Sequence, residues 1–272
     1  MSFMENTHIN LTSYEGVENM DRFTEDSFKK YCSDKLLSCN KYISFLKKQI
    51  PKPQMKILEV GSGSGKLLFR LEKEGMLLRG VGFEPSSTRT AFADRFAKYV
   101  KSSLVEIHKQ DYVKSSLEGD CFDVIIGIDV VINLIGAVSK NYINDFFKKS
   151  SEYLKPDGLI ILESITLQRE IDAIRKSENG IFTPWKRFAE SDPFKYGLDE
   201  MSLDELGNLV WKKFFIERNT GREESFTNVL QPLNKSSMKV IAEDNGLKVS
   251  FFDNWDELDD TSDEEFVAVF TK

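Results

Sequence analysis

Short apolar runs alternate with helix-like segments through the middle of the chain. The runs occupy residues 56–60, 80–83, 104–108, 122–128 and 159–163. Between them, apolar residues recur at helical spacing, and strands that alternate with helices form a mostly parallel sheet covered by helices. The pattern therefore predicts an α/β fold whose core spans residues 51–164.

The segment before this core is predicted to be helical. Residues 23–50 place apolar side chains among lysines at mostly helical spacing, and Pro-Lys-Pro at 51–53 ends the pattern. We therefore expect an N-terminal helical cap over residues 1–50.

The pattern changes after residue 164. Residues 165–235 contain a charged helical segment, two aromatic-rich stretches and a hairpin turning at 219–221, and they are expected to form an inserted lid that binds the acceptor. Residues 236–272 predict a helix over 238–244, ended by Gly246, and strands over 247–252 and 265–271. This C-terminal strand pair is expected to complete the core with an antiparallel edge.

Composition limits the class of protein. The chain has 272 residues, of which 40% are hydrophobic and 30% charged, so one elaborated domain can bury its own core. A net charge of -7 provides no overall basic field and disfavours nucleic acid as a partner. No apolar run approaches the length of a membrane span, so we expect a cytoplasmic protein, monomeric or homodimeric, with no membrane partner.

The cysteines indicate neither a disulfide framework nor a metal site. Cys32, Cys39 and Cys121 are odd in number and lack CxxC spacing, which is typical of free thiols in a reducing compartment. We expect no bound metal.

A glycine-rich loop, "LEVGSGSGKL" over residues 58–67, joins the first predicted strand to a helix. Strand-loop-helix junctions at the carboxyl end of a parallel sheet are ligand sites. Glycines let the backbone approach a ligand closely, and the helix N-terminus presents free N–H groups. The loop is therefore the first candidate for a cofactor site.

Several nucleotide-binding and catalytic motifs fit this loop poorly. A P-loop has glycine where Val60 stands and Ser or Thr where Leu67 stands, and a nucleophile elbow has Ser in place of Gly63. A dinucleotide fingerprint has glycine in place of Lys66, although Glu84 suits its acidic position. An NAD-dependent oxidoreductase therefore remains an alternative.

The run from Glu59 to Gly65, of the form ExGxGxG, resembles motif I of the class I S-adenosylmethionine-dependent methyltransferases. Other stretches resemble this family in the same order along residues 56–164: "GVGFEPS", "IHKQDYV", "FDVIIGIDVVINLIG", which is similar to motif IV, and "YLKPDGLIILES", which is similar to the family's turn before strand five. The resemblance implies a Rossmann-like sheet of seven strands, mostly parallel with one antiparallel strand, and S-adenosyl-L-methionine as cofactor, with S-adenosyl-L-homocysteine as product.

The resemblance also implies which residues bind the cofactor. It assigns Glu84 to the ribose hydroxyls, Asp111 to the adenine amino group and the backbone N–H of Tyr112 to the adenine ring. The remaining expected contacts are Glu59, Gly61, Ser62, Gly63, Gly65, Pro85 and Asp129. Because this cofactor has no pyrophosphate, Lys66 is expected to contribute little.

Methyl transfer requires few catalytic groups. Alignment and exclusion of water lower much of the barrier, and a base is needed only when the acceptor must lose a proton. Asp129 is the candidate closest to the cofactor, and Glu163 is the candidate base. His8 and Tyr14 are further candidates, because the N-terminal segment often folds over the cofactor in this family.

A small molecule is the expected acceptor. The sequence has neither [DN]PP[YFW] after the fourth strand nor a Pro-Cys nucleophile, which disfavours methylation of DNA bases. Candidate acceptor-binding residues are Asn133, Trp185, Arg187 and Arg222, although the aromatic side chains of the insertion could instead form its own small core. Resemblance to bacterial small-molecule enzymes suggests a sugar, nucleotide-linked or phosphorylated intermediate of surface-glycan or secondary metabolism. Oxygen and nitrogen both remain open as the methylated atom, and a non-catalytic protein that binds the cofactor is an alternative.

Overall fold

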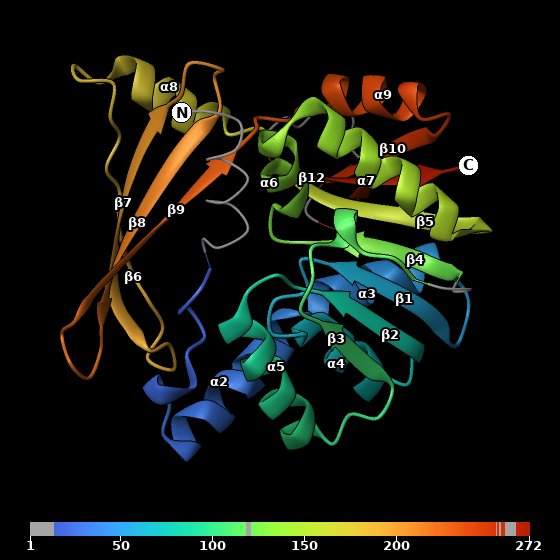
Figure 1. Cartoon of the computed structure of the whole chain (residues 1–272), viewed down its shortest axis with the longest axis horizontal. Helices are drawn as coiled ribbons and strands as arrows, with labels where there is room; N and C mark the ends of the chain where they lie inside the picture. The colour runs from blue at the N-terminus through green and yellow to red at the C-terminus, as the bar shows by residue number, and fades with distance from the viewer. Residues whose placement is uncertain (1–13, 118–120, 254, 256, 259–264) are drawn as a thin grey trace.

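A computed structural model describes residues 14–117, 121–253, 255, 257–258 and 265–272, and within them it contains two β-sheets (Figure 1). The larger sheet has the strand order β11-β10-β12-β5-β4-β1-β2-β3. Its strands are β1 (Met55–Val60), β2 (Leu77–Phe83), β3 (Val105–His108), β4 (Phe122–Gly127), β5 (Leu154–Ile165), β10 (Lys248–Asp253), β11 (Glu257–Leu258) and β12 (Glu265–Thr271).

The direction of the strands confirms the predicted architecture. The pairs β1–β2, β1–β4, β2–β3 and β4–β5 are parallel, whereas β12 runs antiparallel to both β5 and β10. One reversed strand therefore lies in an otherwise parallel sheet of seven. The short strand β11 adds an antiparallel edge beside β10, which the sequence did not predict.

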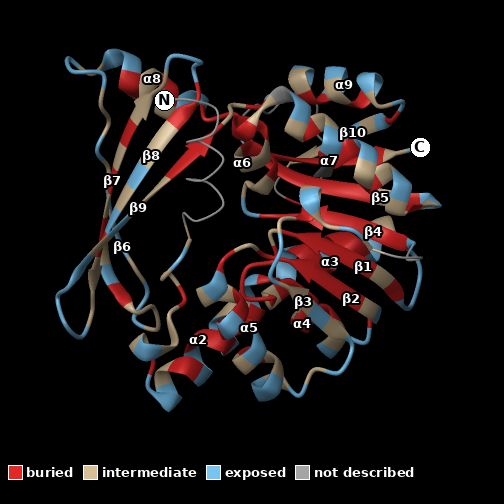
Figure 2. Cartoon of the chain, in the orientation of Figure 1, coloured by how far each residue is buried: buried red, intermediate tan, exposed pale blue. Residues whose placement is uncertain are grey.

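Helices cover both faces of this sheet. One face carries α2 (Glu25–Ser38), α3 (Asn40–Gln49), α4 (Lys66–Lys73) and α5 (Ser87–Val100), and the other carries α6 (Val131–Val138), α7 (Lys140–Tyr153) and α9 (Lys235–Asp244). The central strands β1, β4 and β12 are largely buried, whereas β3 and β10 are partly exposed (Figure 2). None of the helices in the described part of the chain is long and apolar enough to cross a membrane.

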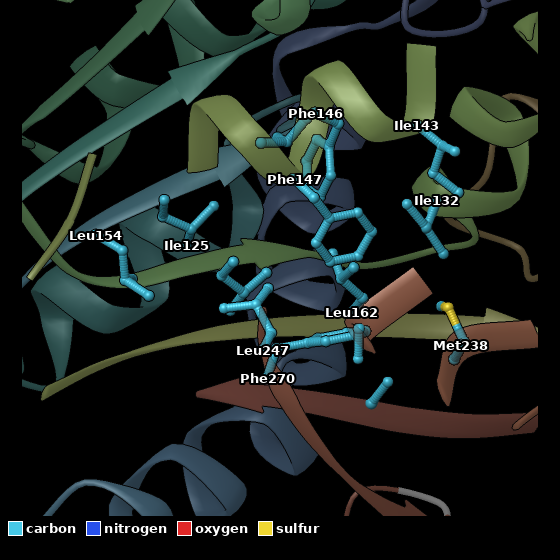
Figure 3. Close-up of a cluster of buried hydrophobic side chains, with 14 of the residues drawn as sticks. Ile125, Ile132, Ile143, Phe146, Phe147, Leu154, Leu162, Met238, Leu247 and Phe270 are labelled. Carbon is cyan, nitrogen blue, oxygen red and sulfur yellow. The ribbon is translucent and has the colours of Figure 1, made fainter. Parts of the chain in front are cut away.

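One hydrophobic cluster joins three helices to the large sheet (Figure 3). Phe146 and Phe147 of α7 and Met238 of α9 are fully buried and pack near Leu162 of β5 and Phe270 of β12. Burial of each large apolar side chain stabilises the fold by roughly 1.5–3 kcal/mol. This cluster fixes α7 and α9 against the centre of the sheet.

Two local predictions differ from the structure. The helical pattern over residues 23–50 divides into α2 and α3 at Cys39. This residue lies between the two helices with φ -84° and ψ 0°, and its side chain makes no capping hydrogen bond to α3. The expected turn at "LKPDG" is part of β5, because Leu154 already pairs with Phe122 of β4 and an irregularity follows in the register.

A second, four-stranded sheet follows β5 and α8 (Gln168–Lys176). Its strands β6 (Trp185–Arg187), β7 (Phe194–Leu203), β8 (Leu209–Glu217) and β9 (Glu223–Leu230) are all antiparallel to their neighbours. The hairpin of β8 and β9 confirms the prediction, but β6 and β7 were not predicted as strands. In Figure 1 this sheet stands beside the carboxyl end of the large sheet and faces the described start of the chain.

Candidate active site

A pocket of about 570 Å³ lies between the carboxyl ends of β1, β2 and β4 and the second sheet. Residues of the loops after these strands form its floor, and Tyr14 lies in its wall. Lys186 of β6 and Lys213 of β8 line it from the second sheet. The pocket therefore joins the cofactor motifs of the core to side chains of the inserted region.

The glycine loop is shaped by left-handed backbone that only glycine adopts easily. Gly61, Gly63 and Gly65 have φ values of 65°, 55° and 76°. A Cβ atom on Gly61 would lie 2.5 Å from the side chain of Val131, and one on Gly63 would lie 2.2 Å from Arg89. Gly61, Ser62 and Ser64 line the pocket, whereas Gly63 and Gly65 keep the loop close to its neighbours.

Glu59 is a buried carboxyl group of this pocket that lacks hydrogen-bond partners. Its side chain is 1% exposed, and neither carboxyl oxygen has a hydrogen-bond partner. Burial raises the pKa of Glu59 to about 8. The hydroxyl of Ser62, buried in the adjacent loop, also lacks a partner. Because buried polar groups are normally hydrogen-bonded, these atoms are suited to a cationic, hydrogen-bonding ligand.

Glu84 follows β2, the strand paired with β1, and also lines the pocket. Its carboxylate is 4% exposed and accepts hydrogen bonds from the backbone N–H groups of Gly63, at 2.9 Å, and Ser86, at 3.0 Å. Arg89 is 3.6 Å away. These donors hold the carboxylate at the pocket, beside Pro85, with oxygen lone pairs left to accept from hydroxyl groups.

Asp111 and Tyr112 follow β3 and line another part of the pocket. Asp111 caps the short helix η2 (Tyr112–Lys114) by accepting from the N–H of Val113 at 3.1 Å, and it also accepts from the Tyr142 hydroxyl. The Tyr112 hydroxyl is bound to Ser150 at 3.1 Å, so the Tyr112 ring is held in place as part of the wall.

Asp129 and Lys66 form an ion pair within the pocket, with 2.6 Å between Nζ and Oδ2. Asp129 and Val130 have φ values of 55° and 63°, and a strained turn of this kind is typical of functional sites. Burial acts to raise the pKa of Asp129, but the ammonium of Lys66, together with the charges of Lys35 and Arg89, outweighs burial and holds the pKa below its usual value. Asp129 is therefore an anion, and Lys66 has a role that the sequence did not indicate.

Glu163 and Asn133 lie outside the residues that line this pocket. Glu163 accepts from Lys41 at 3.1 Å, from the indole of Trp255 at 2.8 Å and from the N–H of Asp129 at 2.7 Å. Asn133 is completely buried and bridges the backbones of Ile165 and Gln231. The partners of both side chains indicate structural roles instead of the expected base and acceptor contact.

The candidates from the inserted region are also placed away from the pocket. Trp185 is 67% exposed, and Arg187 forms an exposed ion pair with Glu190. Arg222 lines a separate surface depression beside Arg22. Several aromatic side chains of the insertion pack on one another, which is the alternative that the sequence left open: Phe188, Phe194, Phe215 and Phe226.

Of the two N-terminal candidates, the structure places one. Tyr14 lines the pocket, and its hydroxyl accepts a hydrogen bond from Asn228 of β9 at 3.1 Å. The Arg89 guanidinium stands 5.0 Å from the centre of its ring. His8 lies outside the described residues.

Sequence reasoning missed most of the cations around the pocket. Lys35 of α2, Arg89 of α5, Lys186 and Lys213 all line it. Their positions follow no motif, since they come from elements far apart in the chain. An alternating pattern in residues 194–203 could have revealed β7, but not which lysines face the pocket.

The strand order and the glycine loop together define the fold of class I methyltransferases, and comparison with known proteins agrees. Residues 51–197, more than half of the chain, match the family profile described as a methyltransferase domain. The chain therefore belongs to the methyltransferase domain family, among the class I S-adenosylmethionine-dependent methyltransferases.

Individual proteins resemble the chain in sequence or in structure. A protein of Geobacillus sp. (strain WCH70) named as a methyltransferase is 30% identical over 148 residues, which cover 52% of this chain and only 57% of that protein. The structure of the CcbJ methyltransferase from Streptomyces caelestis superposes with a TM-score of 0.71 at 16% identity, covering 96% of this chain and 98% of that one. The sugar N-methyltransferase KedS8 from Streptoalloteichus sp. ATCC 53650 gives a TM-score of 0.59 at 14% identity, with 85% of each chain covered.

The cofactor of this family is S-adenosylmethionine, and the residues of the pocket fit it. The unpartnered Glu59 carboxylate suits the ammonium of its amino-acid end, and Glu84 retains acceptor capacity for ribose hydroxyls. Asp111 can accept from an amino group at the adenine end. Within the described residues, no group of three or more His, Cys, Asp and Glu side chains is arranged to hold a metal ion.

Proposed function

We propose that this chain transfers a methyl group from S-adenosylmethionine to an oxygen or nitrogen of a small molecule. The observation that carries the proposal is the two-sided pocket. Carboxylates of the core line one side, and Lys186 and Lys213 of the second sheet line the other, so cofactor and acceptor can share one pocket of about 570 Å³. A volume of this size is typical of small-molecule sites.

In this proposal the chain contributes alignment and exclusion of water. The bound cofactor supplies an activated methyl group on a sulfonium. Glu59, Glu84 and Asp111 hold its polar ends, and apolar side chains of α6 form a dry wall beside them: Val131, Leu134, Ile135 and Val138. Tyr14 closes the pocket from the N-terminal side. Positioning and desolvation of this kind accelerate an in-line displacement.

We assign an electrostatic role to Asp129. Its ion pair with Lys66 keeps its pKa low, and a carboxylate of low pKa accepts protons poorly near neutral pH. Asp129 therefore orients Lys66 and places negative charge near the sulfonium. Tyr14 is the other polar candidate for contact with the acceptor, because its hydroxyl lines the pocket beside Asn228.

The acceptor that we propose is a sugar, nucleotide-linked or phosphorylated intermediate. The similarity in fold to an enzyme named as a sugar N-methyltransferase supports this class.

The location that we propose is the cytoplasm, because the free thiols of Cys32, Cys39 and Cys121 suit a reducing compartment.

The direct test is release of S-adenosylhomocysteine with a panel of acceptors. The panel contains amino sugars, nucleotide sugars and phosphorylated sugars, and calorimetry measures binding of S-adenosylmethionine in parallel. Turnover with one chemical class supports the proposal. Tight cofactor binding without turnover of any acceptor would instead support a non-catalytic binding protein, and binding of NAD in place of S-adenosylmethionine would support the oxidoreductase.

A further inference from the structure

Two lysines of the second sheet point toward the cofactor side of the pocket. Lys186 is paired in register with Gly197 of β7, and Lys213 of β8 is paired with Asp199 of β7. Since side chains alternate along a strand, Lys186, Asp199 and Lys213 share one face of the sheet. Both lysines line the pocket.

The three charges on this face do not balance. Lys186 is 3.4 Å from the carboxylate of Asp199, which is 5% exposed. Lys213 has no carboxylate within 4.0 Å in the part of the chain that the structure describes, and its ammonium lies 3.9 Å from the centre of the Trp211 ring. Asp199 therefore pairs with Lys186 only, and the charge of Lys213 stays without an ion-pair partner.

Lys35 of α2 lines the same pocket from the core side. Burial lowers the pKa of its ammonium, and the Glu18 and Asp129 carboxylates act against this shift, so Lys35 belongs to the charges of the core. Lys66 is neutralised by Asp129, and Arg89 contacts Glu18 at 3.1 Å. On the second sheet, the ammonium without an ion-pair partner among the described residues is therefore that of Lys213.

The carboxylates that line the pocket lie on its core side: Glu59, Glu84, Asp111 and Asp129. The second sheet instead presents Lys186 and Lys213 to the pocket. Charges interact more strongly in a partly desolvated pocket than in water, so this side attracts a ligand that carries negative charge. The indole Nε1 of Trp211 is a further buried donor without a partner, and its ring lies against Lys213.

We propose that Lys213 and Lys186 bind an oxyanion of the acceptor, either a phosphate or a carboxylate. The inference rests on the proposed function and narrows its acceptor to anionic small molecules. Lysine ammonium groups bind oxyanions as point charges, and the neighbouring Asp199 orients Lys186. The methyl acceptor atom then lies on the part of the molecule that extends toward the glycine loop.

The test measures anion binding to the full chain with S-adenosylhomocysteine already bound, so that the cofactor side is filled. Inorganic phosphate, pyrophosphate and citrate are titrated separately, by calorimetry and by tryptophan fluorescence, because Trp211 contacts Lys213. Saturable binding is expected, with Lys213→Met and Lys186→Met each weakening it roughly tenfold. Lys213→Arg keeps the charge and should keep binding.

Lys212→Met is the matched control. Lys212 is the neighbour of Lys213 on β8, but it faces outward and pairs with Glu200 at 2.9 Å. Equal anion affinity for Lys213→Met and Lys212→Met, or no saturable anion binding to the S-adenosylhomocysteine complex, would overturn the inference alone. Failure of the chain to bind S-adenosylhomocysteine at all would overturn the proposed function as well. The ratio between phosphate and citrate affinities identifies which oxyanion the site favours.

Discussion

Lys66 Nζ lies 2.6 Å from Asp129 Oδ2, which joins the first residue of α4 to the turn after β4. The two residues are far apart in the sequence and meet because β1 and β4 are neighbouring parallel strands. The pair lines the pocket beside Glu59. Lys66 therefore takes part in the charge balance of the site, and its contribution to cofactor binding stays a prediction.

Replacing Lys66 with Met should weaken cofactor binding in a pH-dependent way. The Lys66 charge lowers the pKa of Glu59, so its removal keeps Glu59 protonated to higher pH. We expect S-adenosylmethionine affinity to fall roughly tenfold near neutral pH, equivalent to about one pKa unit, and to recover at higher pH. Calorimetry across this range measures the effect. Lys73→Met, at the other end of α4, is the control, and the same loss at every pH would contradict the explanation.

Glu59 should make folding stability depend on pH in the free protein. Its pKa rises from 4.5 to about 8 on folding, so the unfolded chain ionises first. Stability is therefore highest below the unfolded pKa and declines as pH rises through the folded pKa. Glu59→Gln should remove this decline and be more stable than the parent by a few kcal/mol, about 1.4 kcal/mol per pKa unit, above that range. Urea unfolding at both ends of the range measures it. The exposed Glu106→Gln should not change the pH dependence.

Glu84→Ala should weaken S-adenosylmethionine binding by about 2–4 kcal/mol, which is roughly 30- to 1000-fold. The substitution removes the proposed acceptor of the ribose hydroxyls and also the acceptor for the Gly63 and Ser86 N–H groups. Glu84→Gln keeps the shape and one oxygen acceptor, so it should lose less. Calorimetry measures the affinities for S-adenosylmethionine and, as the ligand that a P-loop would bind, for ATP. Unchanged S-adenosylmethionine affinity in Glu84→Ala would exclude the ribose role.

Glu163→Gln should reduce the stability of the protein and leave the pH dependence of kcat/KM unchanged. Three donors surround the Glu163 carboxylate, from Lys41, Trp255 and the backbone of Asp129. An amide can satisfy fewer of them, and the loss should be about 1–3 kcal/mol. Thermal unfolding and the pH dependence of kcat/KM measure the two effects. Loss of an ionisation from the pH dependence of kcat/KM, with Tm unchanged, would instead identify Glu163 as a catalytic base.

Arg22→Gln should loosen the second sheet from the core. Arg22 is largely buried and forms ion pairs with Glu217, at 2.7 Å, and with Glu224, so the start of the chain is joined to β8 and β9. We expect a loss of about 1–3 kcal/mol in stability and a higher KM for the acceptor. Arg187→Gln removes only an exposed pair and should have an effect near zero. Equal effects of the two substitutions on KM would mean that the Arg22 contacts do not position the sheet.

The sequence by itself determined the class I core. The period of its strands and helices set the α/β architecture, and the glycine loop with Glu59, Glu84 and Asp111 identified the family and one side of the pocket. Each of these residues lies at or shortly after the carboxyl end of a strand. Because the carboxyl ends of parallel strands lie at one edge of the sheet, such residues come together once the sheet has formed. The loop glycines are a local feature, because left-handed backbone at these positions favours glycine whatever the rest of the chain does.

Only the tertiary structure decided which charged side chains share the pocket. The pairing of β6 and β7 with the expected hairpin turned Lys186 and Lys213 toward the core, while it left Arg187 and Lys212 outside. A shift of one residue in strand register would exchange these faces, and register depends on long-range packing that no local pattern encodes. The partners of Glu163 were equally hidden from the sequence, because two of its donors come from α3 and from the segment after β10.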